Sequence, residues 1–150
     1  MCRSEVVKLL APRLAYALAP LVLALFACSS GAGVGADFPA AADATVTSSA
    51  GKLRVELRTA PSPAARGTDR VKLTMLDATS GGPVDGLTVT ITPWMPAMGH
   101  GTSVKPTVIA LGQGSYSSDD VALFMAGHWE LRTTITGGIE DSATLAVDIP

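Results

Sequence analysis

The chain has 150 residues, and 47% of them are hydrophobic, a share that supports a globular core. Its 11 Lys and Arg are outnumbered by 13 Asp and Glu, which argues against nucleic-acid binding, because neutralising phosphates requires a basic face. Both cysteines, Cys2 and Cys28, lie near the N-terminus, so we expect no disulfide within the folded part of the chain.

An export signal is predicted at the N-terminus. Residues 1–13 carry three basic side chains against one acidic one, and residues 14–26 form a 13-residue apolar run. A basic start followed by an apolar run of this length is typical of a secretory signal peptide. The run is shorter than the roughly 20 residues that a membrane-spanning helix requires. We therefore expect residues 1–27 to be removed during export.

The apolar run ends in Leu25-Phe26-Ala27-Cys28, which resembles a bacterial lipobox. An aliphatic residue stands three positions before the cysteine, and a small residue stands immediately before it. The resemblance implies that Cys28 becomes a lipidated N-terminus, anchoring the protein to a membrane of the bacterial cell envelope, facing the periplasm or the outside. The alternative is an ordinary cleaved signal with Cys28 as an incidental cysteine. Removal of residues 1–27 leaves 8 basic against 12 acidic residues, a net charge of −4.

Residues 28–50 are predicted to form a flexible tether. The segment is rich in Ser, Gly and Ala and holds few large apolar side chains. A chain of this composition cannot bury enough surface to order itself. The tether would hold a folded domain, residues 51–150, just clear of the membrane surface.

The domain of residues 51–150 is predicted to be all-β. Apolar and polar side chains alternate in short runs, as in Leu53, Val55 and Leu57, and no window has helical periodicity over three turns. The expected strands are 52–58, 70–76, 87–92, 104–111, 114–118, 129–135 and 143–149. About seven short strands with turns between them favour an antiparallel, immunoglobulin-like β-sandwich. Pro93 and Pro96 are expected to end the third strand, because proline cannot donate to a ladder.

Two short segments hold both histidines and three of the five methionines of the chain. They are Trp94–His100 and Phe124–Trp129. Methionine thioether and histidine imidazole together form a ligand set suited to monovalent copper. The candidate ligands are Met95, Met98, His100, Met125 and His128. Because one segment leaves a predicted strand and the other enters one, we hypothesise that they meet at one end of the sandwich as a copper(I) site.

Four of the five candidate ligands also have a structural interpretation, whereas Met98, between Ala97 and Gly99, has less reason to be buried. Met95 and Met125 follow aromatic residues and would serve as core residues, since methionine fills irregular gaps and favours aromatic contacts. His128 would serve as a hydrogen-bonded structural residue and His100 as a surface residue. Zinc and calcium are disfavoured, because the loop lacks nearby cysteines and clustered acids. Two hypotheses stay open: a copper(I) carrier, buffer or assembly factor, and a metal-free β-sandwich module that contacts a protein partner in the envelope.

The order of these motifs resembles the YtkA-like domain family. The specific parts are Met95-Pro96-Ala97-Met98-Gly99-His100 and Gly127-His128-Trp129, accompanied by Gly82-Pro83-Val84-Asp85-Gly86 and Gly114-Ser115-Tyr116. The resemblance covers roughly residues 52–149. It implies a small exported or membrane-tethered β-sandwich, distantly similar to FixH-type proteins linked to copper delivery during oxidase assembly. It implies no particular biochemical activity, since most members of the family have none assigned.

The sequence offers no arrangement typical of catalysis. The nucleophile elbow Gly-x-Ser-x-Gly is absent. The adjacent acids Asp119 and Asp120 fall on a predicted loop, where exposed charge is the default. We therefore expect a protein that is not an enzyme.

Overall fold

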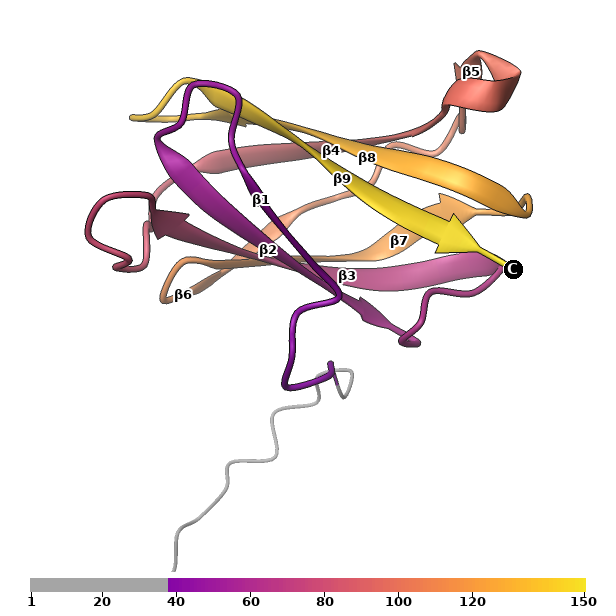
Figure 1. Ribbon diagram of the computed structural model, residues 1–150, viewed down its shortest axis with the longest axis horizontal. Coiled ribbons are helices and arrows are strands. Elements are labelled where there is room, and N and C mark those ends of the chain that lie inside the picture. Colours follow the sequence, from indigo (N-terminus) through magenta and orange to yellow (C-terminus); the bar gives the residue numbers. More distant parts are fainter. Residues whose placement is uncertain (1–37) are drawn as a thin grey trace, which may run out of the picture. The chain divides into compact units, whose positions relative to one another are not determined.

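The computed structural model describes residues 38–150, which form two antiparallel β-sheets packed face to face (Figure 1). The first sheet has the strand order β1-β2-β3-β7-β6 and the second the order β5-β4-β8-β9. The first sheet consists of β1 (Ala44–Thr47), β2 (Leu53–Ala60), β3 (Gly67–Asp77), β7 (Ser115–Leu123) and β6 (Ile109–Gly112). The second consists of β5 (His100–Gly101), β4 (Thr88–Met95), β8 (Gly127–Thr136) and β9 (Asp141–Ile149). A short 3-10 turn, η1 (Pro96–Met98), joins β4 to β5. Among residues 38–150, no helix has the length and apolar character needed to cross a membrane.

The core lies between the sheets and follows from the two-residue period of the strands. In β2, Leu53, Val55 and Leu57 are fully buried, while the residues between them face outward. The largest fully buried side chains include Trp129, Tyr116, Leu53, Leu57, Leu73 and Met75. The prediction of an all-β antiparallel sandwich is confirmed, with nine strands in place of about seven.

The folded region begins before the predicted boundary at Gly51. Residues Ala44–Thr47 form β1 and pair with β2, so the prediction of a flexible tether is wrong for this stretch. The sequence did not indicate this strand, because these residues carry small side chains in a segment rich in Ser and Ala. The predicted signal peptide, Cys28 and the part of the predicted tether before Phe38 lie outside the described residues.

Asp43 fixes the start of β1 to the end of β2. Its carboxylate accepts hydrogen bonds from the backbone N–H and the hydroxyl of Thr59, at 2.6 and 2.9 Å, and from the Ser62 hydroxyl at 2.6 Å. Burial alone would raise the pKa of Asp43, but these hydrogen bonds outweigh burial and hold the pKa below its ordinary value. The ionised carboxylate therefore acts as a structural tie.

Several predicted strand ends differ from the structure. The strand expected over 104–111 is a strand only from Ile109, where β6 begins. β4 continues through Pro93 to Met95, and Pro93 lies opposite Leu131 of β8. On its other side β4 pairs with β5 only at Trp94 and Met95. No residue of β5 pairs with Pro93, so the lack of an N–H on proline costs no hydrogen bond on that side. The acids at 119 and 120 lie within β7, where the structure replaces the predicted loop with strand.

Candidate metal site

The two segments rich in methionine and histidine lie side by side at one end of the second sheet. β4 pairs with β8 through Trp94 and Glu130, and η1 contacts β8. The end of β4 then turns through η1 into β5 (Figure 1). There Met95 pairs with His100. The backbone arrangement therefore agrees with the hypothesis that the segments meet. The directions of the side chains decide which donors can act together.

Backbone contacts hold the η1–β5 loop in place. Gly99 adopts the left-handed conformation at φ 66°, and its N–H donates to the carbonyls of Met95 and Pro96 at 3.1 and 3.2 Å. Gly101 packs so closely on Pro93 that a Cβ at this position would overlap the Pro93 carbonyl oxygen. The backbone on either side of Met98 and His100 is therefore held in a defined conformation.

Met95 is a core residue. Its side chain is 3% exposed and belongs to the same buried cluster as Trp129. A Cβ at Gly127 would lie 3.4 Å from the Met95 Cε, so the methyl end reaches the start of β8. The structural interpretation of Met95 fits this position, because the thioether is surrounded by protein.

Met98 and His100 are the exposed donors of the loop. Met98 is 57% exposed, whereas Met75 and Met95 are buried. His100 is exposed, and its Nδ1 lies 3.1 Å from the carbonyl oxygen of Gly101. A carbonyl can only accept, so the proton of this contact belongs to Nδ1. The neutral ring then has a free lone pair on Nε2, the arrangement common among metal-binding histidines.

Met125 and His128 stand at the start of β8, and they differ in direction. Met125 is half-buried against the core, and its carbonyl accepts a hydrogen bond from the indole N–H of Trp129 at 2.9 Å. His128 alternates with the buried Trp129 and therefore lies on the outer face of the second sheet, opposite to the face of Met95. Its Nδ1 is 2.8 Å from a carboxylate oxygen of Asp148 on β9.

The five predicted ligands thus fall into three groups. Met98 and His100 share the exposed loop, Met95 and Met125 pack against the core, and His128 faces outward with Asp148. Within residues 38–150, no three side chains of His, Cys, Asp or Glu gather closely enough to hold a metal ion. A metal bound at this end would therefore depend on methionine sulfur.

Two contacts of this end were not predicted. Asp148 orients His128, and the Arg132 guanidinium lies over the Trp94 ring at 4.7 Å from its centroid. Strand parity was the available signal for the side-chain directions. Val89, Ile91 and Met95 share parity in one strand, and Trp129 and Leu131 share it in the other, which directs Met95 inward and His128 outward.

A pocket also lies away from the η1–β5 loop. A pocket of about 360 Å³ lies beside the ends of β2 and β9, and its lining includes Asp43, Ser62 and Asp148. Asp43 is engaged by Thr59 and Ser62, as described above, and neither histidine lines the pocket.

The chain is similar to one protein family in sequence and to solved structures in its fold. The YtkA-like family matches residues 47–134. No curated protein matches the chain in sequence. Among solved structures, FetP of uropathogenic Escherichia coli strain F11, as isolated, shares 9% identity over 71% of this chain and 93% of its own, with a TM-score of 0.49. A copper-bound variant of FetP shares 9% identity over 71% and 91% of the two chains, with a TM-score of 0.44. At these values the metal of FetP is not transferred to this chain.

Proposed function

The chain belongs to the YtkA-like family, and from that premise we propose that its domain is a copper(I)-binding module of the bacterial cell envelope. The donors are Met98 and His100 on the η1–β5 loop, with the half-buried Met125, just before β8, as a further sulfur donor. Such a module serves as a carrier, a buffer or an assembly factor for a copper-dependent partner. Met95 and His128 are not part of this reduced ligand set.

The observation that carries the proposal is the exposure of Met98. Of the methionines among residues 38–150, Met75 and Met95 are buried and Met125 is half-buried, whereas Met98 is 57% exposed. An exposed methionine two residues from an exposed histidine offers a thioether and an imidazole on one short loop. These soft donors suit copper(I), which binds well to sulfur and tolerates low coordination numbers.

The residues fit copper(I) better than other ions. Zinc sites are built from thiolate, imidazole and carboxylate, and the described residues gather no such trio. Calcium requires six or more oxygen ligands, and the loop of residues 95–101 has no acidic side chain. Copper bound here would be held mainly by one loop, an arrangement that allows release to a partner.

Export and anchoring complete the proposal. The signal-like N-terminus and the lipobox-like sequence before Cys28 support a lipid anchor on a membrane of the envelope. Mass spectrometry of the N-terminal peptide from bacterial membranes tests this part, because lipidation adds acyl chains to Cys28. A mature N-terminus at another residue would contradict the anchor without affecting the metal site.

A binding role without catalysis fits the same site. The two histidines lie on different faces of the second sheet, and each is engaged by one hydrogen-bond acceptor. An acid–base mechanism requires a base within hydrogen-bond reach of a nucleophile or a substrate position. Neither histidine stands in such a relation to a described nucleophile, which supports a protein that is not an enzyme.

The decisive experiment is an anaerobic copper(I) titration against a chromogenic competitor. We would use the chain from Ser29 onward, compared with the double variant Met98→Leu/His100→Asn. The expected result is one-to-one binding that weakens at least about 10-fold in the variant, the equivalent of 1.4 kcal/mol. Met95→Leu and His128→Asn are the matched controls, each with about the affinity of the parent chain. No competition by the parent chain, or equal loss in the controls, would overturn the proposal.

A second candidate function is supported by the apolar side chains at the same end. Phe124 and Met98 are each 57% exposed. Exposed aromatic and methionine side chains are enriched at protein interfaces. The alternative is therefore a metal-free interaction module that contacts a protein partner in the envelope. A parent chain that fails to bind copper(I) but loses a partner on Phe124→Ser would favour it.

A further inference from the structure

The outer face of β2 and β3 is basic. Arg54, Arg58, Arg70 and Lys72 project from this face, each alternating with buried residues of the core. Glu56 is the one acidic side chain among the outward positions of these two strands. Lys52 and Arg66 flank the strands and are exposed. The face therefore carries a strong local excess of positive charge.

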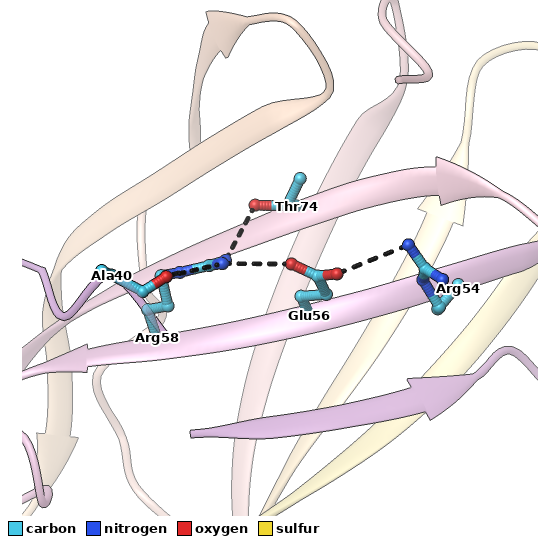
Figure 2. A network of polar contacts seen from close by, with 5 residues as sticks. All are labelled: Ala40, Arg54, Glu56, Arg58 and Thr74. Carbon is cyan, nitrogen blue, oxygen red and sulfur yellow. Dashed lines mark hydrogen bonds and ion pairs between the residues drawn. The ribbon is translucent and has the colours of Figure 1, made fainter. Parts of the chain in front are cut away.

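Like charges face each other across this pair of strands. Arg58 lies directly opposite Lys72 in the ladder, an arrangement that is destabilising unless other groups compensate. Glu56 sits between Arg54 and Arg58, at 3.6 and 3.2 Å from their guanidinium groups (Figure 2). Lys72 instead lies over the Phe38 ring, 5.3 Å from its centroid. One carboxylate therefore serves two arginines, which leaves the face positively charged.

Charge is distributed unevenly over the described residues. The segment 52–72 holds six of the eight Lys and Arg of residues 38–150, against Glu56 and the buried Asp69. The rest of these residues carries Lys105 and Arg132 against nine carboxylates. Asp119 and Asp120 of β7 border the basic face beyond β3, and Asp120 accepts hydrogen bonds from Thr107 and Ser118. The domain therefore has one basic face, although the net charge of the chain is negative.

The chain enters the described domain on this same face. Phe38 covers Lys72, and the carbonyl of Ala40 accepts hydrogen bonds from Arg58 at 3.4 and 3.3 Å (Figure 2). Only nine residues separate Phe38 from Cys28, so their α-carbons are at most about 35 Å apart. A lipid anchor at Cys28 would keep the basic face near the headgroups.

We propose that the outer face of β2 and β3 docks on the anionic headgroups of a membrane. Basic residues near an anionic leaflet attract it within a Debye length, about 8 to 10 Å at physiological salt. A lipid chain and a basic patch also reinforce each other as membrane anchors. The inference relies on the proposed anchor only for proximity to the membrane, and it is independent of copper.

The test is co-sedimentation with lipid vesicles, using the chain from Ser29 onward without lipid. Both described sheets and the core between them lie within residues 38–150, so we expect this chain to retain the fold. The vesicles contain phosphatidylcholine with or without phosphatidylglycerol. We expect binding only with phosphatidylglycerol, weakening as salt rises. Each cation near the surface strengthens binding about fivefold, so Arg54→Ser/Arg70→Ser should weaken it roughly 30-fold.

Lys105→Glu is the matched control, because it also lowers the net charge by two and Lys105 is exposed outside the basic face. It should change vesicle binding by less than about threefold. Equal loss in the control would mean that net charge, and no particular face, governs binding, which overturns the proposal. Absence of binding by the parent chain at low salt overturns it too. So does binding to soluble heparin without binding to vesicles, since the partner would then be a soluble polyanion. Because no anchor is present, these outcomes are separate from the test of lipidation at Cys28.

Discussion

Replacing Met95 by alanine should destabilise the domain far more than replacing Met98, because Met95 is buried and Met98 is exposed. Met95 is 3% exposed within the core, so its replacement removes buried Cγ, Sδ and Cε atoms and opens a cavity beside Gly127. Substitutions of this kind cost about 2–5 kcal/mol, and we expect about 3 kcal/mol. Met98 is 57% exposed and leaves no enclosed cavity. Its replacement should change the free energy of unfolding by no more than about 0.5 kcal/mol.

The assay is urea unfolding without copper, followed by the fluorescence of Trp94 and Trp129. With a slope near 2 kcal/mol/M, Met95→Ala should lower the midpoint by about 1.5 M, and Met98→Ala by less than about 0.3 M. Met95→Leu is the control, since a swap of similar volume should cost under about 1.5 kcal/mol. A Met95→Ala cost below about 1 kcal/mol, or a larger cost for Met98→Ala than for Met95→Ala, would refute the packing assignment.

Three further perturbations test the fold around the site. Asp69 is 2% exposed, and burial raises its pKa. The protonated carboxyl therefore favours the folded domain below about pH 4, and this contribution is lost as pH rises through the folded pKa. Asp69→Asn should stabilise the domain at pH 7 and lose this advantage near pH 4, as measured by thermal unfolding. For Asp141, burial alone would raise the pKa, but hydrogen bonds from Ser48 and Ala50 lower it. The ionised carboxylate therefore stabilises the folded domain above about pH 4, and this stabilisation is lost as pH falls through the folded pKa. Asp141→Asn should cost about 1 kcal/mol of unfolding free energy at pH 7 and little near pH 2, by the same measurement. Gly101→Ala should displace β5 from Pro93 at a cost of about 1–3 kcal/mol in urea unfolding and weaken copper(I) binding, whereas Gly82→Ala, at a position with space for a Cβ, should do neither.

Half-buried strands were the part of the fold best predicted from sequence. β2, β3 and β9 alternate apolar and polar residues because one face meets the core and the other meets solvent. β5 was missed because two residues, His100 and Gly101, carry no readable period. β1 was missed because its small side chains are half-buried or exposed, so the pairing with β2 is specified mainly by the partner strand.

The neighbourhood of the candidate site was predictable, but its ligand set was not. Strand ends meet at the ends of a sandwich, so the two segments were expected to approach each other. Side-chain direction depends on strand parity, and a shift of one residue reverses it. Because the predicted strand ended at Pro93, Met95 was not assigned to the inward-facing side of the strand with Val89 and Ile91. Continuing the strand to Met95, as the structure does, directs its thioether into the core.

The two proposals assign different sheets to different tasks. The basic face belongs to β2 and β3 of the first sheet, whereas the η1–β5 loop belongs to the edge of the second. With the first sheet resting on headgroups, Met98 and His100 would remain accessible to a partner that accepts copper. Substitutions on either sheet should then act independently: Arg54→Ser/Arg70→Ser should leave copper(I) affinity unchanged, and Met98→Leu/His100→Asn should leave vesicle binding unchanged. Loss of both properties in either variant would show that the two surfaces are coupled and would contradict this division.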